Sequence, residues 1–318
     1  MLRFGRKLSF SWSSFPRPLK SSEGVILHDP VVKSTVLLSI KALSSRQLRN
    51  YCRRVAVEQS AADAIAPVST KAQLNNLPPT KSKGGLQIVQ EALGLSNATY
   101  PSLWSRSLLL SIDFEHLDNI RSGFTKGGNC QVGIATLDTS NLQKDLLPPP
   151  NNLIETYNYV SGSNQYIKKV IPKFIFGESL VVNSASILKM IELIIPQHQN
   201  RRIIIVSHGI QNELMALHAL GYRFSANMHA VCSHRLAVET LGLQCALGKL
   251  LRWVGCPYHS LHIGGNDAHF TLKACLLLAL HNNHDTEDTT SLAGYLKGVA
   301  TSDVPHQSQP EVQTGRRG

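Results

Sequence analysis

The sequence lacks the features that are typical of membrane proteins, of disulfide-rich proteins and of proteins with a glycine-rich nucleotide-binding loop. No apolar run approaches the ~20 residues that a membrane-spanning helix needs, so we expect a soluble protein without a membrane partner. The six cysteines are scattered and form no CxxC pair, which argues against a zinc ribbon or disulfide framework and favours a reducing compartment. The pairs Gly127-Gly128 and Gly264-Gly265 lack the GxGxxG and Walker spacings of phosphate-binding loops.

Acidic residues are also absent from the first 22 positions, which hold Arg3, Arg6, Lys7, Arg17 and Lys20 together with several serines. This composition is typical of a mitochondrial transit peptide, although ordinary basic tails share it. A mitochondrial location is therefore one expectation for this protein.

The net charge of +11 is concentrated in the N-terminal third of the chain. Residues 1–107 hold 15 Lys/Arg and 5 Asp/Glu, whereas residues 108–284 hold 14 and 11. Such a basic arm can add salt-sensitive affinity for nucleic acid that is blind to sequence. It can equally be a solvated, disordered extension. Nucleic acid is thus one candidate partner, and protein partners stay unknown.

The composition divides the chain into three parts. Residues 1–100 form a basic, partly disordered extension, in which we expect a helix over 44–65, a polar linker over 68–85 and a short helix over 86–95. Residues 101–284 form the ordered domain. Residues 285–318 are polar and poor in apolar side chains, so we expect a disordered tail.

The ordered domain has the pattern of an α/β protein. We expect strands over 108–115, 131–138, 154–160, 201–206 and 230–235, and helices over 184–195, 210–220, 246–254 and 266–282. A turn-rich segment over 121–129 suits a hairpin between the first two strands. This order predicts a ribonuclease H-like mixed sheet flanked by helices, with an antiparallel front and parallel strands behind.

Two carboxylates end the first strand. Because side chains on a strand alternate between its faces, Asp113 and Glu115 point the same way and can clamp a hard divalent cation. Far along the chain, His262 lies five residues before Asp267 at an expected helix start. Each residue alone has an ordinary interpretation as a strand-end acid, a surface histidine or a helix cap. Together they are an inventory for metal-assisted phosphodiester cleavage.

Three sequence blocks, residues 111–115, 205–214 and 262–268, resemble in that order the DEDDh branch of 3′–5′ exonucleases. The resemblance covers about residues 103–282, and it looks closest to a fungal group related to a yeast mRNA-export cofactor. It implies a nuclear or cytoplasmic location, a nucleic-acid substrate and two Mg²⁺ or Mn²⁺ ions.

The resemblance also assigns roles to five side chains. Asp113 would bridge the two ions, with Glu115, Glu213 and Asp267 as further ligands. His262 would deprotonate the attacking water, a task that a neutral imidazole near pH 7 suits.

The middle block departs from the family pattern at two positions. Glu213 stands where the family has an aspartate, and Gly209 stands where Asp or Asn often follows the histidine. Glutamate keeps the charge but lengthens the arm, and a misplacement of about 1 Å can cost on the order of a hundredfold in rate. The chain is therefore either a metal-dependent 3′–5′ exonuclease acting on RNA or single-stranded DNA, or a non-catalytic nucleic-acid-binding or mRNA-export adaptor.

Other residues are weaker candidates for function. His208 lies on the strand side of the middle block, where local packing is the expected role. Lys168-Lys169 and Arg201-Arg202 can contact a phosphate backbone, but a solvated face is the simpler interpretation of each pair.

Overall fold

The computed structural model describes residues 85–96, 104, 106–143, 147–195, 201–281 and 291–305. All of them belong to one compact unit. The expected transit peptide and the expected helix over 44–65 lie outside the described residues. Among the described helices, none combines the length and the apolar character that crossing a membrane would require.

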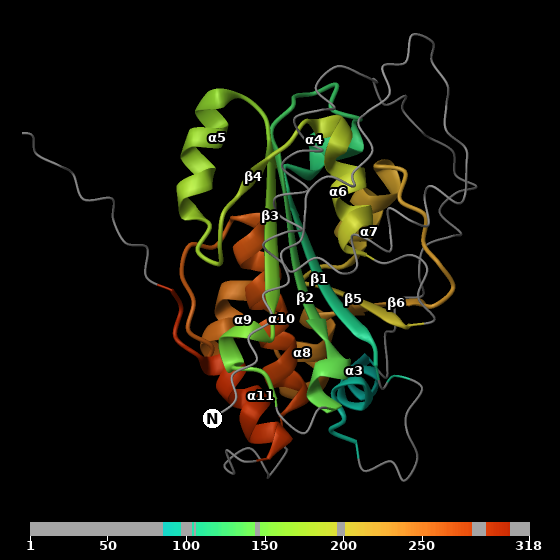
Figure 1. Ribbon diagram of the computed structural model, residues 1–318, viewed down its shortest axis with the longest axis vertical. Coiled ribbons are helices and arrows are strands. Elements are labelled where there is room, and N and C mark those ends of the chain that lie inside the picture. The colour runs from blue at the N-terminus through green and yellow to red at the C-terminus, as the bar shows by residue number, and fades with distance from the viewer. Residues whose placement is uncertain are drawn as a thin grey trace, which may run out of the picture. The chain divides into compact units, whose positions relative to one another are not determined.

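The centre of the fold is a mixed sheet with the strand order β4-β3-β2-β1-β5-β6 (Figure 1). The strands are β1 (Leu108–Glu115), β2 (Cys130–Asp138), β3 (Glu155–Ser161), β4 (Leu180–Val181), β5 (Ile203–Ser207) and β6 (Met228–Cys232). β1 is antiparallel to β2, which is antiparallel to β3, while β5 and β6 run parallel to β1. The expected mixed sheet, with its antiparallel and parallel parts, is confirmed.

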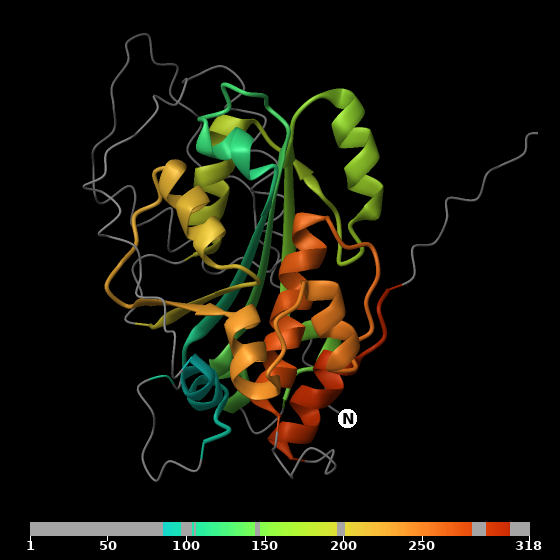
Figure 2. The same cartoon turned by 180° about the vertical axis from the view of Figure 1, so that it is seen from behind.

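Helices flank this sheet. They are α3 (Gly85–Leu93), α4 (Leu117–Arg121), α5 (Asn164–Val170), α6 (Ile187–Ile194), α7 (Gln211–Ala219), α8 (Ser233–Leu241), α9 (Leu247–Trp253), α10 (Gly264–Ala279) and α11 (Leu292–Thr301). Figures 1 and 2 show α4, α6 and α7 gathered on one side, with α9, α10 and α11 on the other. α10 packs across β1, β2 and β3, and nearly all of its residues are buried.

The core beneath α10 explains why this helix has little polar surface. Leu109 of β1, Leu137 of β2 and Ile204 of β5 belong to one buried apolar cluster with Phe270 and Leu276 of α10. A helix covered on most sides by a sheet and by other helices needs apolar residues around its whole circumference. The cluster continues into α3, α8, α9 and α11, so α3 is part of the fold although it lies in the predicted basic extension.

The predicted disordered tail is wrong for the segment that forms α11. Ala293, Leu296 and Val299 are buried at a helical spacing, so they form an apolar stripe that packs on α10. The Ser291 hydroxyl caps the helix by accepting the Gly294 N–H at 3.0 Å. The Lys273 ammonium of α10 donates to the Ser302 carbonyl at 3.2 Å beyond the last turn. A short apolar stripe is hidden when the composition is averaged over the whole tail.

Several element boundaries also differ from the predicted ones. The strand expected over 230–235 ends at Cys232, and Ser233 begins the unpredicted helix α8. Helices α4 and α5 and the two-residue strand β4 were not predicted either. All three are short, so they carry too few residues for a hydrophobic period to be recognised.

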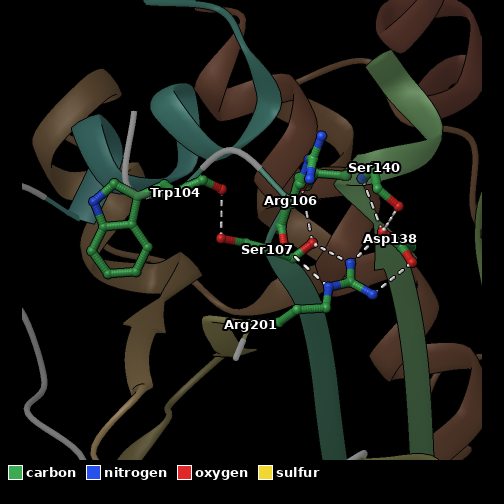
Figure 3. Close-up of polar contacts among 7 residues, drawn as sticks. Trp104, Arg106, Ser107, Asp138, Ser140 and Arg201 are labelled. Atoms are coloured by element: carbon green, nitrogen blue, oxygen red, sulfur yellow. Dashed lines mark hydrogen bonds and ion pairs between the residues drawn. The ribbon is translucent and has the colours of Figure 1, made fainter. Parts of the chain in front are cut away.

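One ion pair secures the end of the sheet where β1 begins (Figure 3). The Arg201 guanidinium donates to Asp138 Oδ2 at 2.9 Å and to the Arg106 carbonyl at 3.0 Å, and it also pairs with Asp138 Oδ1. The Ser140 hydroxyl and N–H donate to the same carboxylate. Arg201 therefore links the start of β5 to the end of β2, and this contact accounts for it without a phosphate ligand.

Candidate metal centre

The paired acids lie at the carboxyl end of the central strand. β1 is buried as far as Ile112, after which Asp113 and Glu115 are partly exposed on one face while Phe114 between them stays buried. On the neighbouring strand β2, Gly133 lies opposite Asp113, and Gln131 lies opposite Glu115. The alternation predicted from the sequence therefore holds at this strand end.

A contact between two glycines brings α10 against the acids. A Cβ on Gly133 would lie 1.8 Å from the Gly264 carbonyl oxygen, and a Cβ on Gly264 would lie 3.3 Å from the Asp113 carbonyl oxygen. The first turn of α10 thus rests directly on the backbone of β1 and β2. Glycine inside a strand often marks such a close approach of another backbone.

Substituting Gly133 with alanine is expected to destabilise the protein by about 1–3 kcal/mol or more, because the methyl group meets backbone that cannot rotate away. Urea unfolding of the full-length chain measures this loss. Gly128→Ala is the matched control, since a Cβ there meets nothing within 4 Å. Equal stabilities of the two variants would contradict the packing.

Amide side chains fix the start of α10 in its position. The Asn158 amide oxygen accepts the Gly265 N–H at 3.0 Å, and the Asn266 amide oxygen accepts the Ile175 N–H at 3.1 Å. The Asn266 Nδ2 group donates to the Lys173 carbonyl at 2.8 Å and to the Ser260 carbonyl at 2.7 Å. These bonds orient the next residue of the helix, Asp267.

Asp267 and His262 are tied to one another. Asp267 Oδ2 accepts the His262 backbone N–H at 3.1 Å. Asp267 is not the predicted helix cap, because the N-cap residue of α10 is Ile263 and Asp267 lies within the first turn. The other oxygen, Oδ1, is buried and has no hydrogen-bond partner among the described residues. His262 has φ 64°, a left-handed conformation that is uncommon for a non-glycine residue and is often found at functional sites. Its side chain is exposed.

The structure brings three of the five predicted residues into one group. Ligand atoms of Glu115, His262 and Asp267 all lie within 4.8 Å of one another. Asp113 and Glu213 lie outside this group, but their charges act on it. The carboxylates of Asp267, Glu213 and Glu115 all raise the pKa of Asp113 by repulsion, so the four acids are neighbours.

Glu213 lies on α7, which packs on the opposite side of the sheet from α10 (Figures 1 and 2). It lies in the first turn of α7, is 5% exposed, and its Oε2 atom has no partner among the described residues. The Arg121 side chain of α4 donates to Asn212 Oδ1 at 2.8 Å and so ties α4 to this turn. Gly209 has φ 109°, a backbone conformation that favours glycine.

The electrostatics of the site are those of crowded acids. Burial raises the pKa of Glu213 to about 7 and that of Asp267 to about 7. Burial and then the neighbouring carboxylates raise the pKa of Asp113 well above its ordinary value. The pKa of Glu115 is also raised by burial, and the nearby His262 opposes that rise. Such mutual repulsion is relieved when a cation binds between the acids.

These residues fit a hard divalent cation. All the acidic ligands are carboxylates, which suit Mg²⁺ or Mn²⁺ better than softer metals. Asp267 Oδ1 and Glu213 Oε2 are buried oxygens that find, among the residues that the structure describes, none of the partners that such atoms normally have.

Metal-free protein is expected to lose thermal stability as the pH rises from 5.5 to 8. The raised pKa values mean that folded Glu213 and Asp267 hold protons which the unfolded chain has released, so the stabilisation is lost as pH rises through about 7. Thermal unfolding in EDTA measures this trend. Adding Mn²⁺ should raise the melting temperature more at pH 8 than at pH 5.5, and an equal rise at both values would contradict the carboxylate site.

His208 is not part of the group formed by Glu115, His262 and Asp267, and it has the local packing role that the sequence predicted. Its Nδ1 atom lies 3.0 Å from Ser233 Oγ, and its Nε2 atom lies 2.9 Å from the Cys245 carbonyl. The ring therefore links the end of β5 to the start of α8 and to the loop after α8.

The sequence interpretation did not single out the residues that position the acids. Gly133, Asn158 and Asn266 were missed as supporting residues, and Arg121 was missed as the contact that holds α7. A glycine within a buried strand is the one signal that could have pointed to the helix contact. Nothing in the spacing of the two asparagines indicates their partners.

No curated protein matches this sequence. A family model does match, and it is described as DEDDh_C, the C-terminal domain of proteins like DNA polymerase III subunit epsilon. The match runs over residues 108–278, from the first residue of β1 nearly to the end of α10. It therefore covers the whole carboxylate group and more than half of the chain. The chain belongs to this DEDDh exonuclease family.

Proposed function

We propose that this protein is a metal-dependent 3′–5′ exonuclease that acts on RNA or single-stranded DNA. One observation carries the proposal, namely that Glu115 of β1 and Asp267 of α10 meet beside His262, with Asp113 and Glu213 near enough for the charges of the acids to interact. The family match makes a nuclease the expected activity of such a group.

Asp113, Glu115, Glu213 and Asp267 would hold two Mg²⁺ or Mn²⁺ ions. When bound, such ions neutralise charge on the phosphate and lower the pKa of the attacking water. His262 would take the proton of that water, because its ring is exposed and lies close to Glu115 and Asp267. Asp267 would orient His262 through the bond to its backbone N–H, and the buried Glu213 would keep its charge only while a cation is near.

The finer relationship is also part of the proposal. The three sequence blocks support a place near the fungal group related to a yeast mRNA-export cofactor, and with it a nuclear or cytoplasmic location. The acid-free N-terminus supports a mitochondrial location instead. A tagged full-length chain, compared with one lacking residues 1–22, distinguishes these locations by microscopy.

The activity is tested with single-stranded RNA and DNA of about 20 nucleotides, labelled at the 5′ end, in Mg²⁺, Mn²⁺ or EDTA. We expect a ladder that shortens from the 3′ end, needs the metal and is absent with Asp113→Ala. Asp118→Ala is the matched control, since Asp118 is an exposed acid on α4 outside the group. Retained nucleic-acid binding without product in either metal would contradict the proposal and leave the adaptor role.

A further inference from the structure

The surface of α9 carries an aromatic side chain with two cations beside it. Lys249, Arg252 and Trp253 are all exposed, and their spacing of three and four residues places them on one face of the helix. Leu250 and Leu251 bury the opposite face completely. We call Lys249, Arg252 and Trp253 the α9 patch.

Trp253 has no structural role that explains its exposure. It is 62% exposed, more than any other exposed large apolar side chain that the structure describes. A recess on the surface is lined by the three residues of the α9 patch. A solvent-exposed indole beside cationic side chains is a surface on which a nucleic-acid base can stack.

The cations of the patch are also free to bind phosphate. Within the described part of the chain, neither Lys249 nor Arg252 has a side-chain hydrogen bond or ion pair, in contrast to Arg201, which is held by Asp138. No acidic residue occurs anywhere in residues 240–266. The segment that joins α9 to the metal centre therefore contributes no negative charge of its own.

The α9 patch and the metal centre are joined by the short segment between α9 and α10, and α9 packs against that segment. A Cβ on Gly248 would lie 3.1 Å from Leu261 and 3.3 Å from the Tyr258 hydroxyl, so α9 rests on the segment just before His262. Asn266 holds the same segment through the Ser260 carbonyl. Figure 1 shows α9 alongside α10, whose first turn carries Asp267.

We infer that the α9 patch binds the 5′ portion of a single-stranded nucleic acid whose 3′ end lies at the carboxylates. The inference rests on the proposed function for the position of the 3′ end. Trp253 stacks on an unpaired base, and Lys249 and Arg252 contact the adjoining phosphates. An acidic protein partner would also use these cations and this indole, but the nuclease family of this chain favours a nucleic acid.

Full-length protein is titrated with fluorescein-labelled oligothymidine of about 20 nucleotides, in EDTA. Trp253→Ala is expected to weaken binding about tenfold and to abolish most of the tryptophan quenching that the oligomer causes. The plot of log K against log salt has a negative slope, and each single-strand phosphate contact contributes about 0.7 to its steepness. Lys249→Gln with Arg252→Gln should therefore make this slope less steep by about 1.4. Lys189→Gln with Arg223→Gln removes two exposed cations elsewhere and should leave the slope unchanged.

Cleavage of a trinucleotide separates this inference from the proposed function. The patch variants should cleave it as the natural protein does, because the inference places the patch beyond the nucleotides that occupy the carboxylates. If the patch variants lose cleavage equally on the trinucleotide and on the strand of about 20 nucleotides, the patch serves the fold and the inference is overturned. Unchanged oligothymidine affinity and unchanged tryptophan quenching in Trp253→Ala would overturn it as well. If the natural protein cleaves neither length, the proposed function fails, and the binding titrations still decide whether the patch holds a single strand.

Discussion

Replacing Asp113 with asparagine should reduce cleavage by at least about a thousandfold, equivalent to about 4 kcal/mol of transition-state stabilisation. Asp113 is the acid on which the charges of Asp267, Glu213 and Glu115 all act, so it is a neighbour of all three. An amide in its place removes the charge that a divalent cation needs most. Initial rates on labelled single-stranded RNA measure the loss.

The same substitution should stabilise the protein when metal is absent. The pKa of Asp113 is raised by burial and by three neighbouring carboxylates, so ionising this carboxyl costs the folded state free energy, and asparagine removes that cost. A higher melting temperature in EDTA, together with the lost activity, distinguishes a missing ligand from a damaged fold. Asp118→Asn should change neither quantity. An Asp113→Asn variant that cleaves normally would show that the reaction does not depend on this site.

Shortening Glu213 to aspartate should lower the rate on the order of a hundredfold, although aspartate is the residue of the family pattern. The first turn of α7 is held by Arg121 through Asn212, so we expect the α7 backbone to keep its position when the side chain is shortened. Withdrawing the carboxylate by about 1 Å from the other acids is enough for a loss of that size.

Two further variants serve as controls for Glu213→Asp. One keeps the length of the side chain at position 213, and the other shortens an acid far from the site. Glu213→Gln keeps the length without the charge and should lose more activity than Glu213→Asp. Glu239→Asp, on an exposed position of α8, should have no effect. Single-turnover rates at saturating Mn²⁺ measure the three variants. An Asp variant that matches or exceeds the natural chain would mean that α7 adapts to the shorter arm.

The fold could be predicted to a large extent because it depends on periodic patterns. The alternation in β1 placed Asp113 and Glu115 on one face, and the element order predicted an antiparallel front with parallel strands behind it. The site was predicted as a set of residue types in a fixed order, and the grouping of Glu115, His262 and Asp267 follows that order.

What could not be predicted depends on contacts between distant segments. The approach of Gly264 to Gly133 and the three bonds of the Asn266 amide join parts of the chain that share no local pattern. α11 was missed because its stripe is short and its burial comes only from α10. How far the Glu213 carboxylate reaches depends on the position of α7, and that position is set by the rest of the fold.

The number of Mn²⁺ ions that the full-length chain binds at pH 8, counted by electron paramagnetic resonance, tests the central claim most directly. We predict two ions per chain for the natural protein, a loss of at least one with Asp113→Asn, and no change with Asp118→Asn. A natural protein that binds no Mn²⁺ at millimolar concentration, or an Asp113→Asn variant that binds as many ions as the natural protein, would contradict a metal centre built from these carboxylates.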